Sequence, residues 1–174
     1  MIDPQAPWRT SRLTAEPIVP AHAAAMHVIL SDPAMYSFTG GQPPSLDDLS
    51  ARYELLASRH SPDGAQIWCN WALRERATGE LVGVMQATLP AEGPPSRTAA
   101  GVAAVAWEIG VAHQRQGFAS EAAAAVVSQL HSDGWTVVAH VHPDHVGSQR
   151  VAERAGLAPT QRMVDGEVEW RLGA

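Results

Sequence analysis

The chain of 174 residues contains only one cysteine, Cys69, and its 12 basic residues include no lysine. A single cysteine excludes an intramolecular disulfide and a zinc site built from several cysteines. Because Cys69 lies in an apolar stretch that predicts a strand, we expect it to be a small buried side chain and not a nucleophile.

Long apolar runs and a basic surface are also missing. No stretch approaches the roughly 20 apolar residues that span a bilayer, and the N-terminus lacks the layout of a signal peptide. We therefore expect a cytoplasmic protein without a membrane partner. The 18 acidic residues outnumber the basic ones and give a net charge of -6, which argues against nucleic acid as a partner.

The length and the 45% hydrophobic content predict one globular domain over residues 1–174, with residues 1–10 as a leader. Apolar periodicity and turn residues predict an α/β or α+β fold, with helices packed on a mixed sheet. The expected strands are 11–19, 66–75, 81–89, 102–111 and 135–141, followed by a hairpin within 162–172. The expected helices are 20–30, 45–59, 118–133 and 148–155, and residues 90–101 form a loop.

The most informative segment is residues 107–121, where a strand ends and a long helix begins after a short loop with Gly117. The first N–H groups of a helix lack acceptors and carry the positive end of its dipole, so a phosphate can bind there. Gly117 and Ala119 let it approach the backbone. A glycine that serves only as a turn remains the alternative. The segment matches neither the dinucleotide fingerprint nor the Walker loop.

Residues 114–119, Gln-Arg-Gln-Gly-Phe-Ala, resemble the Q/R-x-x-G-x-G/A loop of the GNAT superfamily of N-acetyltransferases. Residues 142–157 resemble the second signature of that family, N-x-x-S followed by a helix and a Gly-hydrophobic pair. Residues 10–13 resemble the first strand of the branch that includes the ribosomal-protein N-terminal acetyltransferases. The resemblance extends from about residue 11 to residue 172.

The resemblance implies a mostly antiparallel sheet with about four helices and two splayed parallel strands, which end near Val111 and Val141. Acetyl-CoA would bind in the opening between them, with its pyrophosphate on the amides of residues 115–119 and its pantetheine arm along residues 109–111. The cofactor-binding residues implied in this way are Ile109, Gly110, Val111, Gln114, Arg115, Gln116, Gly117, Phe118, Ala119, His145 and Ser148.

Two departures from the family pattern bear on the catalytic acid. His145 stands where the second signature usually has asparagine, and the following helix lacks the tyrosine that many members use as an acid. Serine takes the acid role in related N-terminal acetyltransferases, so the resemblance points to Ser148. An N-cap of the following helix is the other interpretation of Ser148.

Glu108 and His140 compete for the role of general base. Strand alternation places Glu108 on the face opposite Val105, Trp107 and Ile109. His140 lies on the second splayed strand, where some family members carry a catalytic glutamate, and imidazole suits proton transfer near neutral pH. We slightly prefer His140, while a polar residue satisfied at a strand end remains the alternative for both.

His140, His142 and His145 follow no metal-ligand motif, so we expect no metal site. Trp68 and Asn70 share one face of a strand that borders the acceptor pocket in this fold, and Trp71 lies on the other face. We therefore expect an acetyl-CoA-dependent N-acetyltransferase, a monomer or homodimer, whose acceptor is a small-molecule primary amine. The alternatives are a non-catalytic acyl-CoA-binding module and a protein N-terminal acetyltransferase.

Overall fold

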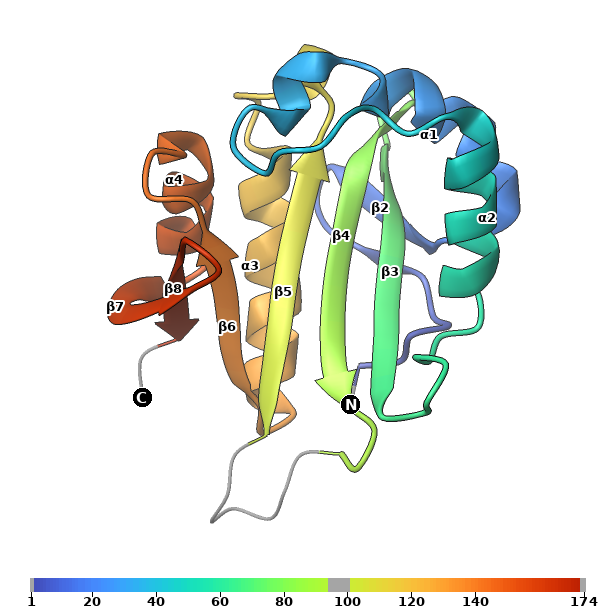
Figure 1. The fold of residues 1–174 in the computed structure, drawn as a ribbon. Coiled ribbons are helices and arrows are strands. Elements are labelled where there is room, and N and C mark those ends of the chain that lie inside the picture. Colours follow the sequence, from blue (N-terminus) through green and yellow to red (C-terminus); the bar gives the residue numbers. More distant parts are fainter. Residues whose placement is uncertain (1, 94–100, 173–174) are drawn as a thin grey trace.

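An eight-stranded sheet organises the computed structural model, which describes residues 2–93 and 101–172. The strands follow the order β1-β2-β3-β4-β5-β6-β8-β7 across the sheet (Figure 1). The strands are β1 (Trp8–Arg9), β2 (Leu13–Pro17), β3 (Gln66–Glu75), β4 (Leu81–Pro90), β5 (Val102–Ile109), β6 (Thr136–Val141), β7 (Leu157–Val164) and β8 (Glu167–Leu172). The helices are α1 (Ala23–Leu30), α2 (Leu46–Leu56), α3 (Phe118–Ser132) and α4 (Val146–Arg154), with short 3-10 helices η1 (Pro20–His22), η2 (Pro33–Tyr36) and η3 (Val111–His113).

One strand pair, β5 and β6, is parallel, and the other neighbouring pairs in the described sheet are antiparallel. The parallel pairing covers Val102 to Ala104 on β5 and Thr136 to Val138 on β6. Beyond these residues both strands continue, to Ile109 and Val141, with no strand between them in the described structure. The expected splay of two parallel strands is therefore confirmed, and it opens the sheet on the side where α3 and α4 begin.

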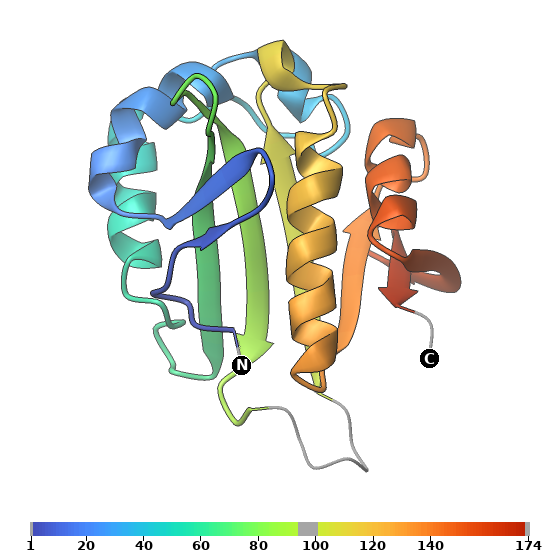
Figure 2. The same cartoon turned by 180° about the vertical axis from the view of Figure 1, so that it is seen from behind.

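Helices cover both faces of the sheet unequally. The long helix α3 lies against β4, β5 and β6, and α4 lies beside it against β6 and β7 (Figure 2). Because apolar side chains point from the sheet toward α3, the larger core forms here, with Trp71, Phe118 and Leu130 among its fully or almost fully buried members. On the other face α1 packs on β4 and α2 packs on α1, in a second core that includes residues of β3 and β4. Neither helix lies over β5 and β6 (Figure 1).

Several predicted boundaries are wrong at the N-terminal side. The predicted leader contains β1, which pairs with β2 and packs Trp8 edge-on against Trp71. The strand predicted from residue 11 begins at Leu13, because residues 10–12 turn between β1 and β2. The chain after Asp32 also forms η2, since the Asp32 carboxylate caps the N–H of Ala34.

Other differences concern the second half of the chain. Helix α4 begins at Val146, two residues before the predicted start, and its N-cap is His145. The predicted hairpin around Asp165 and Gly166 is confirmed, but β7 begins at Leu157 because the strand continues through an irregularity after Pro159. The predicted strand over 102–111 ends at Ile109, where η3 follows. Most of the predicted loop over residues 90–101 lies outside the described residues.

Cys69 lies on β3 and is fully buried, as expected from its apolar surroundings. Burial raises the pKa of its thiol to about 12. None of the helices in the described ranges is long and apolar enough to cross a membrane.

Candidate active site

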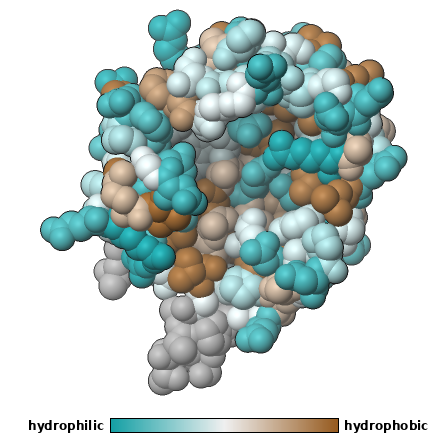
Figure 3. Space-filling view, viewed as in Figure 1, coloured by the Kyte–Doolittle hydropathy of each residue, from teal (hydrophilic) through white to brown (hydrophobic). Residues whose placement is uncertain are grey.

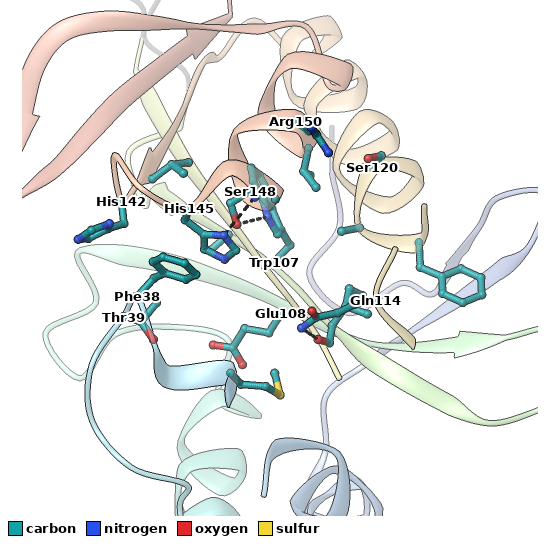
Figure 4. A pocket seen from close by; sticks show the side chains of 18 of the residues that line it. Phe38, Thr39, Trp107, Glu108, Gln114, Ser120, His142, His145, Ser148 and Arg150 are labelled. Carbon is teal, nitrogen blue, oxygen red and sulfur yellow. Dashed lines mark hydrogen bonds between the residues drawn. The ribbon is translucent and has the colours of Figure 1, made fainter. Parts of the chain in front are cut away.

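A cavity of about 580 Å³ lies where β5 and β6 separate. The space-filling view shows the surface hollowed on this face (Figure 3). Its walls come from β5, the loop before α3, the end of β6, the start of α4 and the segment that follows η2 (Figure 4). Segments from distant parts of the sequence thus meet at the point where the sheet is open.

One end of the cavity is the N-terminus of α3. Gly117 is the N-cap in the left-handed conformation, with φ +86°, which glycine adopts without the steric cost of a Cβ atom. Arg115 in the same loop also has a positive φ of 60°. The first-turn N–H groups that follow Gly117 have no acceptors within the helix. This end of the cavity is therefore suited to an anion.

Three arginine side chains also line the cavity. Arg115 from the loop and Arg150 and Arg154 from α4 all line the cavity and are exposed. Arg150 and Arg154 are four residues apart and thus lie on one face of α4. Three guanidinium groups beside a helix N-terminus fit a ligand with several phosphates.

The loop before α3 is held by a carboxylate on that helix. Glu121 accepts hydrogen bonds from the Thr10 hydroxyl at 2.5 Å, the Arg12 N–H at 2.8 Å and the Arg12 Nε at 2.7 Å. Arg12 Nη1 in turn donates to the carbonyl oxygen of Gln116 at 2.8 Å, and its guanidinium lies 4.8 Å from the centre of the Phe118 ring. Burial alone raises the pKa of Glu121, but these hydrogen bonds outweigh it and lower the pKa. The β1–β2 turn thereby fixes the loop before α3 at this end of the cavity.

Ser148 lies in the first turn of α4 and faces the cavity. Its Oγ accepts a hydrogen bond from the indole Nε1 of Trp107 at 3.3 Å (Figure 4). Its backbone N–H donates to Nδ1 of His145 at 3.4 Å, so His145 and not Ser148 caps the helix. The capping interpretation of Ser148 is therefore wrong, and the hydroxyl hydrogen is available to a ligand.

His145 is held on two sides. Its ring stacks on Phe38 with ring centres 4.3 Å apart, and its Nδ1 accepts the N–H of Ser148. Burial and the neighbouring His142 lower the pKa of His145, which favours the neutral ring. A neutral ring with Nδ1 as acceptor carries its hydrogen on Nε2. Phe38 thus connects the segment after η2 to the start of α4 within the cavity lining.

Glu108 and His140 lie on the same open face of the sheet. The pairing of Ala104 with Val138, followed by strand alternation, places both side chains on this face, and both line the cavity. Glu108 is exposed there, and its charge adds to burial in raising the pKa of Tyr36. His140 Nε2 lies 4.0 Å from the carboxylate of Glu169, which is buried and paired with Arg162 and Arg171. The two candidate bases thus stand on the two splayed strands.

The structure brings most of the predicted site residues together. Those that line the cavity are Glu108, Ile109, Gln114, Arg115, Gly117, Phe118, Ala119, His140, His145 and Ser148. Those outside the lining are Gly110, Val111, Gln116, Trp68 and Asn70.

The backbone at residues 109–111 has partners of its own. The carbonyl oxygen of Ile109 accepts a hydrogen bond from Gln114 Nε2, and the N–H of Gly110 donates to the carbonyl oxygen of Val82. The carbonyl oxygens of Gly110 and Val111 accept hydrogen bonds from the backbone N–H groups of His113 and Gln114. The edge of β5 that faces β6 without a neighbouring strand is residues 105–109.

The predicted acceptor strand, β3, is separated from β5 by β4 and contributes no residue to the cavity lining. Trp68 and Asn70 pair with Thr88 and Gln86 on β4, which line a smaller hollow of about 220 Å³ that also contains His140. Trp68 donates to its neighbour Gln66. Asn70 is almost fully buried. These two residues stay a prediction as acceptor contacts.

Among the described residues no group of three His, Cys, Asp or Glu side chains is placed to hold a metal ion. The rings of His142 and His145 instead accept backbone N–H groups of Asp144 and Ser148.

Sequence reasoning missed the segment that follows α1. Met35, Tyr36, Phe38 and Thr39 line the cavity opposite α4. Aromatic residues in a short stretch between two helices were the available signal, but nothing in the sequence relates them to residues more than 100 positions later. The roles of Trp107 and Glu121 were missed for the same reason.

Comparisons with known proteins agree with this geometry. Residues 12–158 match the model of the acetyltransferase (GNAT) domain family. No curated protein matches the chain. An acetyltransferase from Agrobacterium tumefaciens is 24% identical with a TM-score of 0.69, covering 97% of this chain and 95% of that one.

Two further solved structures are similar in fold. RimL, a ribosomal L7/L12 α-N-protein acetyltransferase in complex with CoA, is 17% identical with a TM-score of 0.69 and 93% coverage of both chains. The enzyme AAC(6')-Ib in complex with paromomycin and acetyl-CoA is 16% identical with a TM-score of 0.71 and 93% coverage of both chains. With a family match over most of its length and the splayed strands of its sheet, the chain belongs to the GNAT family of acetyltransferases.

Proposed function

We propose that the protein transfers an acetyl group from acetyl-CoA to the primary amine of a small molecule, by direct attack within a ternary complex. The observation that carries the proposal is the cavity between β5 and β6, because it combines a helix N-terminus and cationic side chains with a carboxylate and an imidazole. Arg115, Arg150 and Arg154 line it together with the first residues of α3, and Glu108 and His140 line it from the open face of the sheet.

The helix N-terminus and the cationic side chains fit the phosphates of CoA. The N–H groups after Gly117 would bind the pyrophosphate, and the three arginines would pair with the remaining phosphate charge. Acetyl-CoA supplies the acetyl group as a thioester, whose thiol has a pKa close to that of cysteine, roughly 8.5, and leaves with modest help. Two of the compared structures contain CoA or acetyl-CoA, which supports this assignment.

The carboxylate and the imidazole would prepare the amine. An amine is protonated at neutral pH and must lose a proton before it attacks a carbonyl carbon. His140 or Glu108 takes this proton, directly or through water, and the Ser148 hydroxyl donates to the departing sulfur. The remaining rate gain comes from holding the amine beside the thioester.

A small acceptor is favoured because Phe38 and the segment around it line the cavity, and Phe38 stacks on His145 at the start of α4. A protein N-terminus is the second candidate, since RimL, a protein acetyltransferase, has a similar fold. Release of CoA is measured with a panel of small mono- and polyamines and with short peptides bearing free N-termini. Turnover of small amines supports the proposal, whereas turnover of peptides alone favours the second candidate.

A non-catalytic acyl-CoA-binding module gives a different result. In that case calorimetry detects binding of acetyl-CoA while no amine or peptide is acetylated. This outcome would refute the proposed activity and retain the cofactor site.

The two candidate bases are distinguished by their pH profiles. With an imidazole base, kcat/KM rises with pH near neutrality. We expect His140→Ala to remove this limb and most of the rate, and Glu108→Gln to keep the limb. A limb that survives in His140→Ala and disappears in Glu108→Gln would identify Glu108 as the base. Comparison of variants is needed because deprotonation of the free amine gives a similar limb.

A further inference from the structure

Trp107 occupies an unusual place on β5. It lies beyond the last residue of β5 that pairs with β6, so no strand adjoins it on that side in the described structure. Its ring is partly buried and lines the cavity, and its Nε1 reaches across the opening to the Oγ of Ser148 on α4 (Figure 4). The hydrogen bond of 3.3 Å is a direct link between the side chains of β5 and α4 in the cavity.

The direction of this hydrogen bond is fixed by chemistry. An indole nitrogen only donates, so Ser148 Oγ must accept. A hydroxyl has one hydrogen and two acceptor sites, and with one acceptor site occupied by Trp107 its hydrogen points away from the indole. Donation to an oxygen also strengthens the hydrogen bond that the same hydroxyl gives to another group.

Not every tryptophan in this protein has a hydrogen-bond partner for its indole N–H. Within the described residues, the buried N–H groups of Trp8, Trp135 and Trp170 have no partner. Trp107 has one, and that partner is a cavity hydroxyl whose backbone N–H is itself held by His145. The main-chain and side-chain positions of Ser148 are therefore both fixed from neighbouring groups.

We propose that Trp107 is a positioning residue that holds the Ser148 hydroxyl with its hydrogen directed toward the leaving sulfur. The inference rests on the proposed function, in which Ser148 donates to that sulfur. Trp107 does not bind the substrates through its N–H. Its loss should therefore lower kcat and leave the KM for acetyl-CoA nearly unchanged.

The test compares Trp107→Phe, which removes the indole N–H and keeps an aromatic ring, with Ser148→Ala and the double variant. We expect Trp107→Phe to lower kcat about three- to tenfold, the effect of one hydrogen bond, with KM for acetyl-CoA within about twofold. In the Ser148→Ala background the same substitution should have no further effect, because the two residues act as one unit. The control is Trp135→Phe. Trp135 lies outside the cavity lining and its buried indole N–H has no hydrogen-bond partner, so this substitution should leave kcat unchanged.

A second readout does not depend on turnover. The signal of the Trp107 indole N–H in the NMR spectrum is identified by its loss in Trp107→Phe, and we expect Ser148→Ala to shift it. An unshifted signal, or an equal loss of kcat from Trp107→Phe in the wild-type and Ser148→Ala backgrounds, would overturn the inference. These outcomes differ from failure of the proposed function, in which the wild-type protein acetylates no amine and the inference falls with it.

Discussion

Replacement of Glu121 by alanine tests whether the β1–β2 turn holds the loop before α3. The substitution removes the acceptor of three hydrogen bonds from Thr10 and Arg12, and the Glu121 side chain is only 18% exposed. Two of these bonds, from the Thr10 hydroxyl and the Arg12 backbone, go to a charged and mostly buried group and contribute about 1.5 kcal/mol each. The pair with the Arg12 guanidinium, which is 46% exposed, adds about 0.5 kcal/mol after screening by solvent.

The sum is about 3.5 kcal/mol of unfolding free energy. For a chain of this length each kcal/mol corresponds to roughly 2–4 °C, so Glu121→Ala should lower the melting temperature by about 10 °C. Glu121→Gln keeps an oxygen acceptor and removes the charge, so about half of this loss is expected. The Arg12 side chain, which also donates to the carbonyl oxygen of Gln116, loses its carboxylate partner in both variants. The loop before α3 is then held less firmly, so the affinity for acetyl-CoA should fall in both.

The pH dependence follows from the lowered pKa of Glu121. A carboxylate with a lowered pKa stabilises the folded state above its unfolded value, about 4.3, and this stabilisation is lost as the pH falls through the lower folded value. The difference in melting temperature between the wild-type protein and Glu121→Gln should thus be largest near pH 7 and shrink below about pH 4. A melting temperature of Glu121→Ala within 2 °C of the wild type at pH 7, measured by scanning calorimetry, would refute the reasoning.

Three other outcomes are expected. Gly117→Val places a branched side chain at a φ of +86°, with its Cβ 3.3 Å from the Arg12 guanidinium. Acetyl-CoA binding measured by calorimetry should be abolished while circular dichroism shows a folded protein. Unchanged binding would contradict the proposed anion site. His145→Ala should lower the melting temperature by about 2–6 °C, because the acceptor for the Ser148 N–H is lost. His145→Asn keeps a capping side chain and should lower the melting temperature by less. Equal decreases in the two variants would show that the stacking on Phe38 contributes more than the cap. The Cys69 thiol, with its pKa raised to about 12, should not react with a thiol reagent at pH 8 until the protein is unfolded in guanidinium. Rapid labelling of the native protein would contradict the burial of this side chain.

The order of elements and the glycine at the start of α3 could be predicted from the sequence because they depend on local signals. Gly79 and the Asp165-Gly166 pair mark hairpins, and Gly117 between a strand and an Ala-rich helix marks the start of that helix. The start of α4 was misplaced because histidine is not a usual N-cap, and only the contact with the Ser148 N–H shows that His145 fills that position. The position of Phe38, in the segment that follows η2, beside the start of α4 could not be predicted, since no local pattern specifies it.

The sequence by itself determined the candidates for the site: a glycine loop at a helix start, Ser148 in a family signature, and Glu108 and His140 on strands. It did so because short-range patterns reflect backbone preferences and side-chain periodicity. The tertiary structure decided which of these meet. The separation of β5 and β6 forms the cavity, and Phe38 stacks on His145 in its lining. Trp107 donates a hydrogen bond to Ser148, which is 41 positions later in the sequence. Such contacts depend on how sheet and helices pack as a whole, and packing is specified by the sum of many apolar side chains and not by any one motif.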